Sequence, residues 1–333
     1  MIHEKIFSFS AEDHRTLGRT MGSCFSSAAR AALKYASSLS EWQWRTKEAP
    51  HYLPYAERYF PQFVDELRGY AEGAGIDFTL FWALAIEEDR AHADKCTTIV
   101  TNNGRLIGHN EDFDSEIGRD LCIIRKTVGD TGTLELFYPY APGGNAIAIN
   151  SSGYIIAVNS LTHSGKKGAG VPRNIIARWL SETKDPRKDF AFLSSLPRSS
   201  GYSHTFLGAD SALHNIEYTA TEARLTKPSM PYIHTNHYLT DLSKYEANTG
   251  SSSTHERFAD ATAAVREHMT TQELKVLMDR TAGGSEKGIM NNDTLGKMII
   301  DRDSLTAHIW LRSEKEKGFI EYPLNSLPTK TAL

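Results

Sequence analysis

The chain has 333 residues, of which 40% are hydrophobic and 23% are charged, and its formal net charge is -4. These values are typical of a soluble globular protein with one large domain or two average ones. The negative charge disfavours nucleic acid and anionic membranes as partners, because both attract basic surfaces. No apolar run approaches the roughly 20 residues of a membrane span. The start, MIHEKIFSFSAEDHR, also lacks the pattern of a signal peptide, so we expect a cytoplasmic location.

Helices are predicted for most of residues 15–95. Apolar residues recur at helical spacing in LGRTMGSCFSSAARAALKYA, around residues 59–70, and in FTLFWALAIEEDR, where Asp77 is a suitable N-cap. From Cys96 the pattern changes to short β-rich runs separated by Gly, Asn, Asp or Pro. These runs are TTIVT, RLIGHN, LCIIRKT, LELFYP, NAIAINS and YIIAVNS. They predict consecutive antiparallel strands.

Helices and strands alternate after this region. GAGVPRNIIARWLSET predicts a helix with Pro172 in its first turn, and SHTFLGAD and IEYTATE predict further strands. Two later helices carry capping-box signatures, Ser253 with Glu256 and Thr270 with Glu273. TLGKMII and LTAHIWL then form a last strand pair. This order predicts an α+β protein with helices on the outer faces of antiparallel sheets.

The segment AHADKCTTIVTNNGRLIGHNED contains the candidate site, because it places a thiol at the first position of a predicted strand. Asn102-Asn103-Gly104 predicts a three-residue hairpin loop that pairs Thr101 with Arg105. In that register Cys96, Asn110 and Asp112 share one face of the hairpin. A loop of another length would turn Asp112 to the other face, so the predicted site depends on this register.

A thiol at the start of a strand has a chemical use if the preceding peptide bond is broken. Cys96 would then carry a free α-amine with a pKa of roughly 7.7–8.0, which can act as the base for its own thiol. The alternative is that Cys96 is a small buried residue without chemistry, as free cysteines usually are. We give that interpretation to Cys24 and Cys122. Three scattered cysteines form neither a disulfide framework nor a zinc site, so we expect them to stay reduced.

Five blocks in order resemble the isopenicillin N acyltransferase family of N-terminal-nucleophile (Ntn) enzymes, which is more remotely similar to the bile salt hydrolases and penicillin V acylases. The first block is DKCTTIV with GRLIGHNEDF. The others are NSSGYIIAVNSL at 150–161, GAGVPRNIIAR at 168–178, HTNHYL at 234–239 and SSTHERF at 252–258. The resemblance covers residues 94 to about 312, and more weakly the helical N-terminal part.

The resemblance implies a four-layer αββα fold and self-cleavage between Lys95 and Cys96. The products would be a helical pro-segment, residues 1–95, and a catalytic part, residues 96–333. Cys96 would be the nucleophile, Asp112 would hold its new α-amine, and Asn236 would help to bind the oxyanion. The resemblance makes Asn159 a second oxyanion candidate, and Asn110 fits beside them as an orienting residue. In the family a Gly precedes the cysteine, where this chain has Lys95.

The substrate class follows less directly. We expect a small-molecule amide or acyl donor, either a linear N-acyl amide that is hydrolysed or an acyl-CoA used for transfer, with no cofactor and no metal. Lys166 and Lys167, in the Gly-rich segment HSGKKGAG, are candidate contacts for CoA phosphates, although solvated lysines are the simpler interpretation. His109 stands where the bile salt hydrolases carry Arg, and it is a further candidate for substrate binding. A homo-oligomer is compatible with the sequence.

Three other functions compete with this one. His234 and His237 form an H-x-x-H pair that suggests a metal hydrolase, but a strand end aims two rings poorly at one ion. A papain-like enzyme would pair Cys96 with an imidazole, yet such nucleophiles sit at helix N-termini. A non-catalytic binding protein on the same fold is the third. Without the resemblance, Asp112 would be assigned to a turn, Asn159 and Asn236 to strand ends, and Asn110 to the solvent face.

Overall fold

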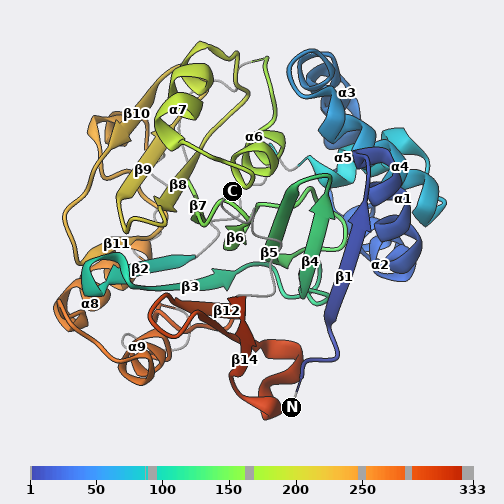
Figure 1. Cartoon of the computed structure of the whole chain (residues 1–333). Helices are drawn as coiled ribbons and strands as arrows, with labels where there is room; N and C mark the ends of the chain where they lie inside the picture. Colours follow the sequence, from blue (N-terminus) through green and yellow to red (C-terminus); the bar gives the residue numbers. More distant parts are fainter. Residues whose placement is uncertain are drawn as a thin grey trace.

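The computed structural model describes residues 2–86, 88, 96–161, 169–246, 253–281 and 287–324. Within these residues the chain forms two β-sheets with helices on both sides, so the predicted α+β class is confirmed (Figure 1). Among the described residues, no helix combines the length and the hydropathy that crossing a membrane requires.

The first sheet has eight strands within the described residues. In spatial order they are β1 (Ile6–Ala11), β4 (Cys122–Val128), β5 (Thr131–Phe137), β6 (Ala148–Asn150), β7 (Ile155–Ser160), β8 (Tyr202–Leu207), β9 (Leu213–Tyr218) and β10 (Ala223–Thr226). All neighbours are antiparallel except β1 and β4, which are parallel. The strand β1 lies in a segment that we expected to be helical, so the N-terminal part also supplies an edge strand. Its sequence, IFSFSA, carries the alternation that predicts a strand.

The second sheet has six strands among the described residues and contains the candidate site. Its spatial order is β11 (Tyr232–His234), β2 (Thr97–Thr101), β3 (Leu106–Asp112), β12 (Thr294–Asp301), β13 (Thr306–Leu311) and β14 (Ile320–Pro323). All neighbours are antiparallel. The strand after Cys96, β2, is therefore an internal strand, with the edge strand β11 on one side and β3 on the other.

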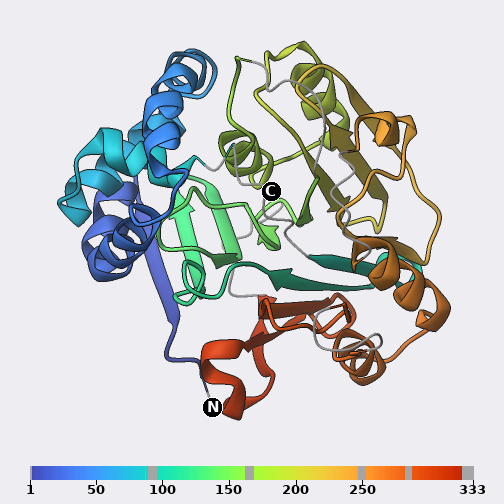
Figure 2. The same cartoon turned by 180° about the vertical axis from the view of Figure 1, so that it is seen from behind.

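Helices cover the outer faces of both sheets (Figures 1 and 2). Five of them precede the site, namely α1 (His14–Cys24), α2 (Ser26–Ala36), α3 (Trp42–Tyr59), α4 (Pro61–Ala74) and α5 (Phe78–Ala85). The later ones are α6 (Arg173–Leu180), α7 (Pro186–Ser195), α8 (Ser253–Ala264) and α9 (Thr271–Met278). The predicted caps at Asp77 and Thr270 are present, but Ser253 is itself the first helical residue of α8.

The alternation of side chains along the strands shows the order of the layers. On β5, the Phe137 ring lies 5.8 Å from Phe25 at the start of α2, while the neighbouring Leu136 faces Gly296 of the second sheet. On β2, Val100 belongs to the core between the sheets, whereas Ile99 packs with the residues of α8 and α9. The two sheets thus lie face to face between two helical layers. This confirms the predicted αββα arrangement.

The turn between β2 and β3 differs from the predicted one. Asn102, Asn103 and Gly104 all have positive φ, of 53°, 50° and 79°, and Arg105 is a fourth turn residue. Thr101 consequently pairs with Leu106, not with Arg105. The turn is held from outside, because the Asn102 side chain forms two hydrogen bonds with the backbone of Met269, of 2.7 and 2.8 Å. The pairing of β3 is shifted by one residue from the expected register.

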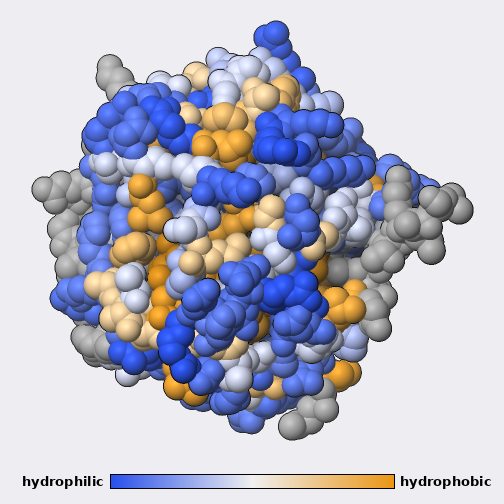
Figure 3. All heavy atoms as spheres, turned by 60° about the vertical axis from the view of Figure 1, so that its left-hand side comes forward, coloured by the Kyte–Doolittle hydropathy of each residue, from blue (hydrophilic) through white to orange (hydrophobic). Residues whose placement is uncertain are grey.

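On the face of the molecule drawn in Figure 3, hydrophobic residues show as strips between hydrophilic ones and not as one broad apolar area. This mixture is normal for a surface in contact with water.

A buried ion pair joins the two parts of the chain that lie on either side of Cys96. Arg178 on α6 donates two hydrogen bonds to Glu66 on α4, of 3.0 and 2.8 Å. Burial disfavours the Glu66 carboxylate, but Arg178 and the hydrogen bonds outweigh burial and lower the pKa of Glu66 well below its ordinary value. The pair therefore stays ionised and fastens the N-terminal helices to the rest of the protein.

Replacing Arg178 tests this fastening. Arg178→Ala leaves Glu66 buried without its guanidinium partner, and we expect a loss of about 3–5 kcal/mol in the free energy of unfolding. The control is Arg187→Ala, which removes an exposed ion pair with Asp185 and should change stability little. Urea denaturation of both variants measures the difference. Equal, small effects would show that the pair does not fasten the two parts.

Candidate active site

Cys96 lies directly before β2 and is buried, with 4% of its surface exposed. Its sulfur is 3.8 Å from Oε2 of Glu111 and 3.8 Å from the main-chain oxygen of Asp112. Both neighbours come from the end of β3. Cys96 also lies level with Glu111 in the observed register, because Thr97 pairs with Asn110. The thiol is therefore next to a carboxylate that the sequence did not single out.

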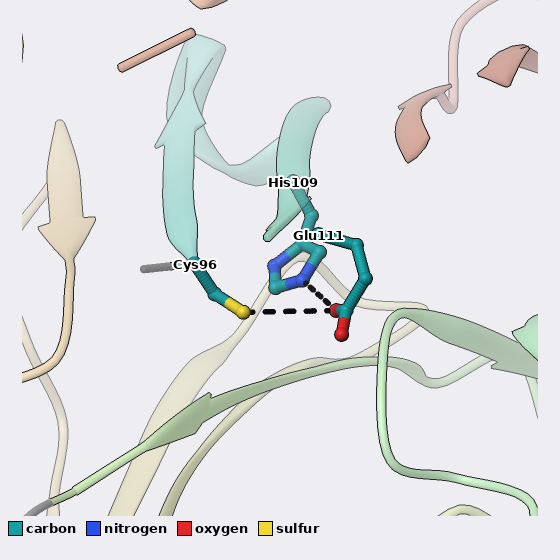
Figure 4. Close-up of side chains that lie close together, drawn as sticks. All are labelled: Cys96, His109 and Glu111. Atoms are coloured by element: carbon teal, nitrogen blue, oxygen red, sulfur yellow. Dashed lines mark hydrogen bonds and ion pairs between the residues drawn. The ribbon is translucent and has the colours of Figure 1, made fainter. Parts of the chain in front are cut away.

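Glu111 is held by two further side chains, as Figure 4 shows in part. Its Oε2 lies 2.9 Å from Nε2 of His109, and its Oε1 accepts a hydrogen bond of 2.6 Å from the Tyr138 hydroxyl. His109, Glu111 and Cys96 are all buried and share the face of the second sheet that looks toward the first. The predicted site residue His109 is thus close to Cys96, but its partner is a carboxylate of its own strand.

A chain of hydrogen bonds fixes the proton between His109 and Glu111. The Asn159 amide nitrogen faces the main-chain oxygen of His234 at 3.5 Å, and its Oδ1 accepts from the Thr98 hydroxyl at 2.8 Å. Because Thr98 has a single hydroxyl hydrogen, its oxygen must accept from Nδ1–H of His109, at 2.9 Å. One hydrogen then lies between Nε2 of His109 and Oε2 of Glu111.

Asn110 and Asp112 point to the other face of β3, which corrects the predicted arrangement. The Asn110 amide donates to the main-chain oxygens of Met278 and Ile289, at 3.0 and 2.9 Å, and so holds the end of α9. Oδ2 of Asp112 accepts from Asn291 at 2.6 Å. The physical reason is the fourth residue of the turn, because a shift of one residue exchanges the two faces of a strand.

Asp112 remains close to the start of β2 despite this exchange. Its carboxyl is fully buried, and Oδ1 makes no hydrogen bond to any described residue. Burial raises the pKa of Asp112 to about 6, although the Arg257 charge and the nearby Thr294 and Asn291 side chains act in the opposite direction. The carboxyl has room for one more cationic or hydrogen-bonding partner.

Arg257, on α8, joins the separate parts of the site. Its guanidinium donates to the main-chain oxygen of Cys96, to the Thr97 hydroxyl and to Oδ1 of Asn236, each at 2.8 Å. The Asn236 amide nitrogen in turn donates to the main-chain oxygen of Ser160 at 3.0 Å. Burial lowers the pKa of Arg257, while the Asp112 charge raises it. Arg257 therefore links Asn236, a predicted site residue, to the main chain of Cys96, and Arg257 itself was not predicted.

A small cavity of about 30 Å³ lies beside the thiol. Its lining combines aromatic rings with amide and hydroxyl groups, and it includes Glu111 but neither Asn110 nor Asp112. The described lining residues are Cys96, Glu111, Phe113, Tyr138, Tyr140, Ala141, Asn145, Val158, Ser160, Asn174 and Tyr202. This volume holds about one or two waters. Lys95, Lys166 and Lys167, which were predicted to belong to the cleavage site and to a CoA site, lie outside the described residues.

The other two thiols differ from Cys96 in their surroundings. Cys24 is exposed at the end of α1, and Cys122 is buried in β4, where burial raises its pKa well above the ordinary value. No disulfide joins any two of the three cysteines. Neither Cys24 nor Cys122 lines the cavity, so their assignment as residues without chemistry stays the simpler interpretation.

The geometry also bears on the competing interpretations. His234 contacts Glu217 at 2.9 Å, and His237 contacts Thr235 and Thr254, so the two rings have separate partners. Cys96 precedes a strand, unlike the helix N-terminus of a papain-like nucleophile.

The donor atoms of Cys96, His109 and Glu111 lie within 4.8 Å of one another, and among the described residues they are the candidate metal ligands. Thiolate, imidazole and carboxylate are ligands that zinc accepts. A metal ion bound there would be coordinated by the Cys96 thiolate itself.

Two residues at the centre of the site were missed, although each lies in a segment that the sequence comparison had used. Glu111 is part of GHNED, and Arg257 is part of SSTHERF. Glu111 directly precedes Asp112 in the sequence. With the correct hairpin register, Glu111 and not Asp112 would have been predicted to face Cys96.

Comparisons with known proteins give a consistent picture. The chain is 25% identical over 211 residues to a Beta-alanyl-dopamine/carcinine hydrolase of Drosophila melanogaster. That match covers 54% of each chain, so the chain spans about half the length of this curated relative.

Solved structures with a similar arrangement include a variant of the conjugated bile acid hydrolase of Clostridium perfringens. It is 10% identical, with a TM-score of 0.45, over 69% of this chain and 92% of that one. Another is the penicillin V acylase of Agrobacterium tumefaciens, 10% identical, with a TM-score of 0.45, over 72% and 89% of the two chains.

The model of one protein family, described as Acyl-coenzyme A:6-aminopenicillanic acid acyl-transferase, matches residues 99–315. This match covers more than half of the sequence, begins three residues after Cys96 and includes the second sheet through β13. The chain therefore belongs to the acyl-coenzyme A:6-aminopenicillanic acid acyl-transferase family.

Proposed function

We propose that the protein is a cysteine amidohydrolase of the Ntn type that forms its own active site by cutting the bond between Lys95 and Cys96. The cut would separate a pro-segment, residues 1–95, from a catalytic part, residues 96–333. The observation that carries the proposal is the position of Cys96. Its thiol is at the start of an internal strand, beside a cavity, and Arg257 holds its carbonyl group. The cytoplasmic location that we expect keeps this thiol reduced.

The new α-amine of Cys96 would be the base for the thiol and Asp112 its holder. Two features of Asp112 support this role. It is one residue beyond Glu111, which lies level with Cys96, and its Oδ1 makes no hydrogen bond to any described residue. After the cut, the α-ammonium group of Cys96 would form an ion pair with the buried Asp112 carboxylate. The uncut chain cannot form this ion pair. Because Asp112 and the thiol are on different faces of the sheet, the carboxyl holds the amine without blocking the sulfur.

In the first chemical step the sulfur attacks the carbonyl carbon of a small N-acyl amide. The amide C–N bond breaks, the amine leaves with the proton taken from the thiol, and the acyl group stays on Cys96 as a thioester. Asn236 is the first candidate for the oxyanion, because Arg257 fixes its Oδ1 and so directs its NH₂ group, of which one hydrogen goes to Ser160. One such donor is worth about 2.7–4 kcal/mol. Asn159 remains the second candidate, and in the uncut chain its amide belongs to the Thr98 network.

Water would then release the acid and restore the thiol. The name of the insect relative, a beta-alanyl-dopamine/carcinine hydrolase, supports an amide of a small amine as the substrate.

Transfer from an acyl-CoA is the second candidate, and the description of the family favours it. Incubation of the protein with acyl-CoA, once alone and once with an added amine, distinguishes acyl transfer from amide hydrolysis. Transfer requires release of CoA that depends on the amine, whereas hydrolysis of the amide needs no CoA.

Turnover by a Cys96→Ala chain tests the proposal. With a panel of N-acyl amines, including beta-alanyl amides, we expect amine release from the wild-type chain and none from the variant. The matched control is Cys24→Ser, which changes an exposed thiol away from the cavity and should retain activity. Amine release from the Cys96→Ala chain at the wild-type rate would refute the assignment of Cys96 as the nucleophile.

The pKa of Asp112 leads to a second prediction, made for the uncut Cys96→Ala chain. Because burial raises this pKa from about 3.9 to about 6, the folded chain binds the proton more tightly than the unfolded one. Stability should therefore fall by about 3 kcal/mol as the pH rises through this window, and stay low above it.

Asp112→Asn in the same chain should remove that fall. We expect the double variant to be more stable than Cys96→Ala at pH 7 and equally stable at pH 4, as measured by urea denaturation. A gain of the same size at both values of pH would mean that ionisation of Asp112 is not the cause.

A further inference from the structure

Self-cleavage raises a chemical problem that the mature enzyme does not have. This inference rests on the proposed function, in which the α-amine of Cys96 is the base during turnover. Before the cut, that nitrogen is part of the peptide bond with Lys95, and an amide nitrogen is not basic. The first attack by the thiol needs another group to take its proton.

Glu111 is the carboxylate whose oxygen approaches the thiol. Its Oε2 lies 3.8 Å from the sulfur of Cys96, and the thiol has the geometry of a donor toward it. Asp112 approaches the sulfur with its main-chain oxygen, while its side chain is on the other face of the strand and bonds to Asn291. Figure 4 shows Glu111 and the thiol pointing toward each other, with His109 beside them. Among the buried carboxyls that the structure describes near Cys96, geometry therefore favours Glu111.

The surroundings of Glu111 suit a group that takes up a proton. Tyr138 fixes Oε1 with a hydrogen bond of 2.6 Å, and this bond directs Oε2 to the side of the thiol. His109 shares one hydrogen with Oε2, and the Thr98 network holds the imidazole in place. His109 and Tyr138 therefore hold the carboxylate in place with Oε2 beside the sulfur of Cys96.

We infer that Glu111 is the catalytic base of self-cleavage, positioned by His109 and Tyr138. Oε2 takes the thiol proton while the sulfur attacks the carbonyl carbon of Lys95. The C–N bond to Cys96 then breaks, and Glu111 returns the proton to the departing nitrogen. Lys95 becomes a thioester on the sulfur. One water molecule hydrolyses it, with OH going to the Lys95 carboxyl group and H to the thiol.

Replacing the two carboxyls separately tests this assignment. Full-length chains carrying Glu111→Gln or Asp112→Asn are made by cell-free synthesis, and the fraction cut after Lys95 is followed over time by intact mass. Glutamine keeps the shape, and its groups can still bond to Tyr138 and His109, but its amide cannot accept the thiol proton. We expect Glu111→Gln to slow cutting by about 10²–10⁴-fold, the usual worth of a general base.

Asp112→Asn should be cut much faster than Glu111→Gln, within about tenfold of the wild-type rate, and then turn over amides poorly. The opposite pattern, with Asp112→Asn uncut and Glu111→Gln cut at the wild-type rate, would overturn the inference. A wild-type chain that stays whole would refute the proposed function itself, which is a different result from a Glu111→Gln chain that is cut normally.

Tyr138→Phe separates a chemical role of Glu111 from a structural one. It removes the hydrogen bond to Oε1 but leaves Oε2 beside the thiol. Loss of a donor strengthens the carboxylate as a base, so this chain should be cut at no less than about a tenth of the wild-type rate. If Glu111 only supported the fold, Tyr138→Phe and Glu111→Gln would slow cutting equally. The melting temperatures of both chains identify any variant that fails to fold. If the Glu111→Gln chain is cut at the same rate as the Tyr138→Phe chain, the inference is contradicted.

Discussion

The four-residue turn between β2 and β3 decides which carboxylate meets the Cys96 thiol. Because Asn102, Asn103 and Gly104 all adopt positive φ, Arg105 becomes the fourth turn residue, and Glu111 lies level with Cys96. The same register sends Asp112 to the helical side. Two hydrogen bonds between the Asn102 side chain, which donates one and accepts the other, and the Met269 backbone before α9 hold this turn. The helical layer thus controls the register of the site through a turn at the far end of the hairpin.

In the proposed mechanism, this division between two faces gives each acidic residue a separate task. On the face toward the first sheet, Glu111, His109 and Tyr138 surround the sulfur beside the cavity. On the helical face, Arg257 holds the Cys96 carbonyl group, and Asp112 keeps a buried carboxyl without its full set of partners. An ionised Asp112 is costly in the uncut chain, and a new ammonium group would relieve that cost. In this proposal, the cut would be favoured by the ion pair that it creates.

Much of the fold could be predicted from the sequence, because the hydrophobic periods of 3.6 and 2 are strong in this chain. The strands after Cys96 and the cap at Asp77 follow from patterns that local physics explains, whereas the four layers were implied by the resemblance to a family. The register could not be predicted, since Asn-Asn-Gly fits turns of several lengths and the choice depends on contacts with a segment over 160 residues away. Glu111 and Arg257 were missed for the same reason, as their importance comes from pairing across strands and layers.

The central claim is that one residue, Cys96, supplies both a thiol and, after a cut, a base. The most direct test is the intact mass and N-terminal sequence of the purified wild-type protein, before and after reaction with a chloroacetamide reagent. The account predicts two fragments, of residues 1–95 and 96–333, with a new N-terminal Cys96 that takes up the reagent. A chain of 333 residues that hydrolyses amides while intact, with Cys96 unmodified, would contradict it.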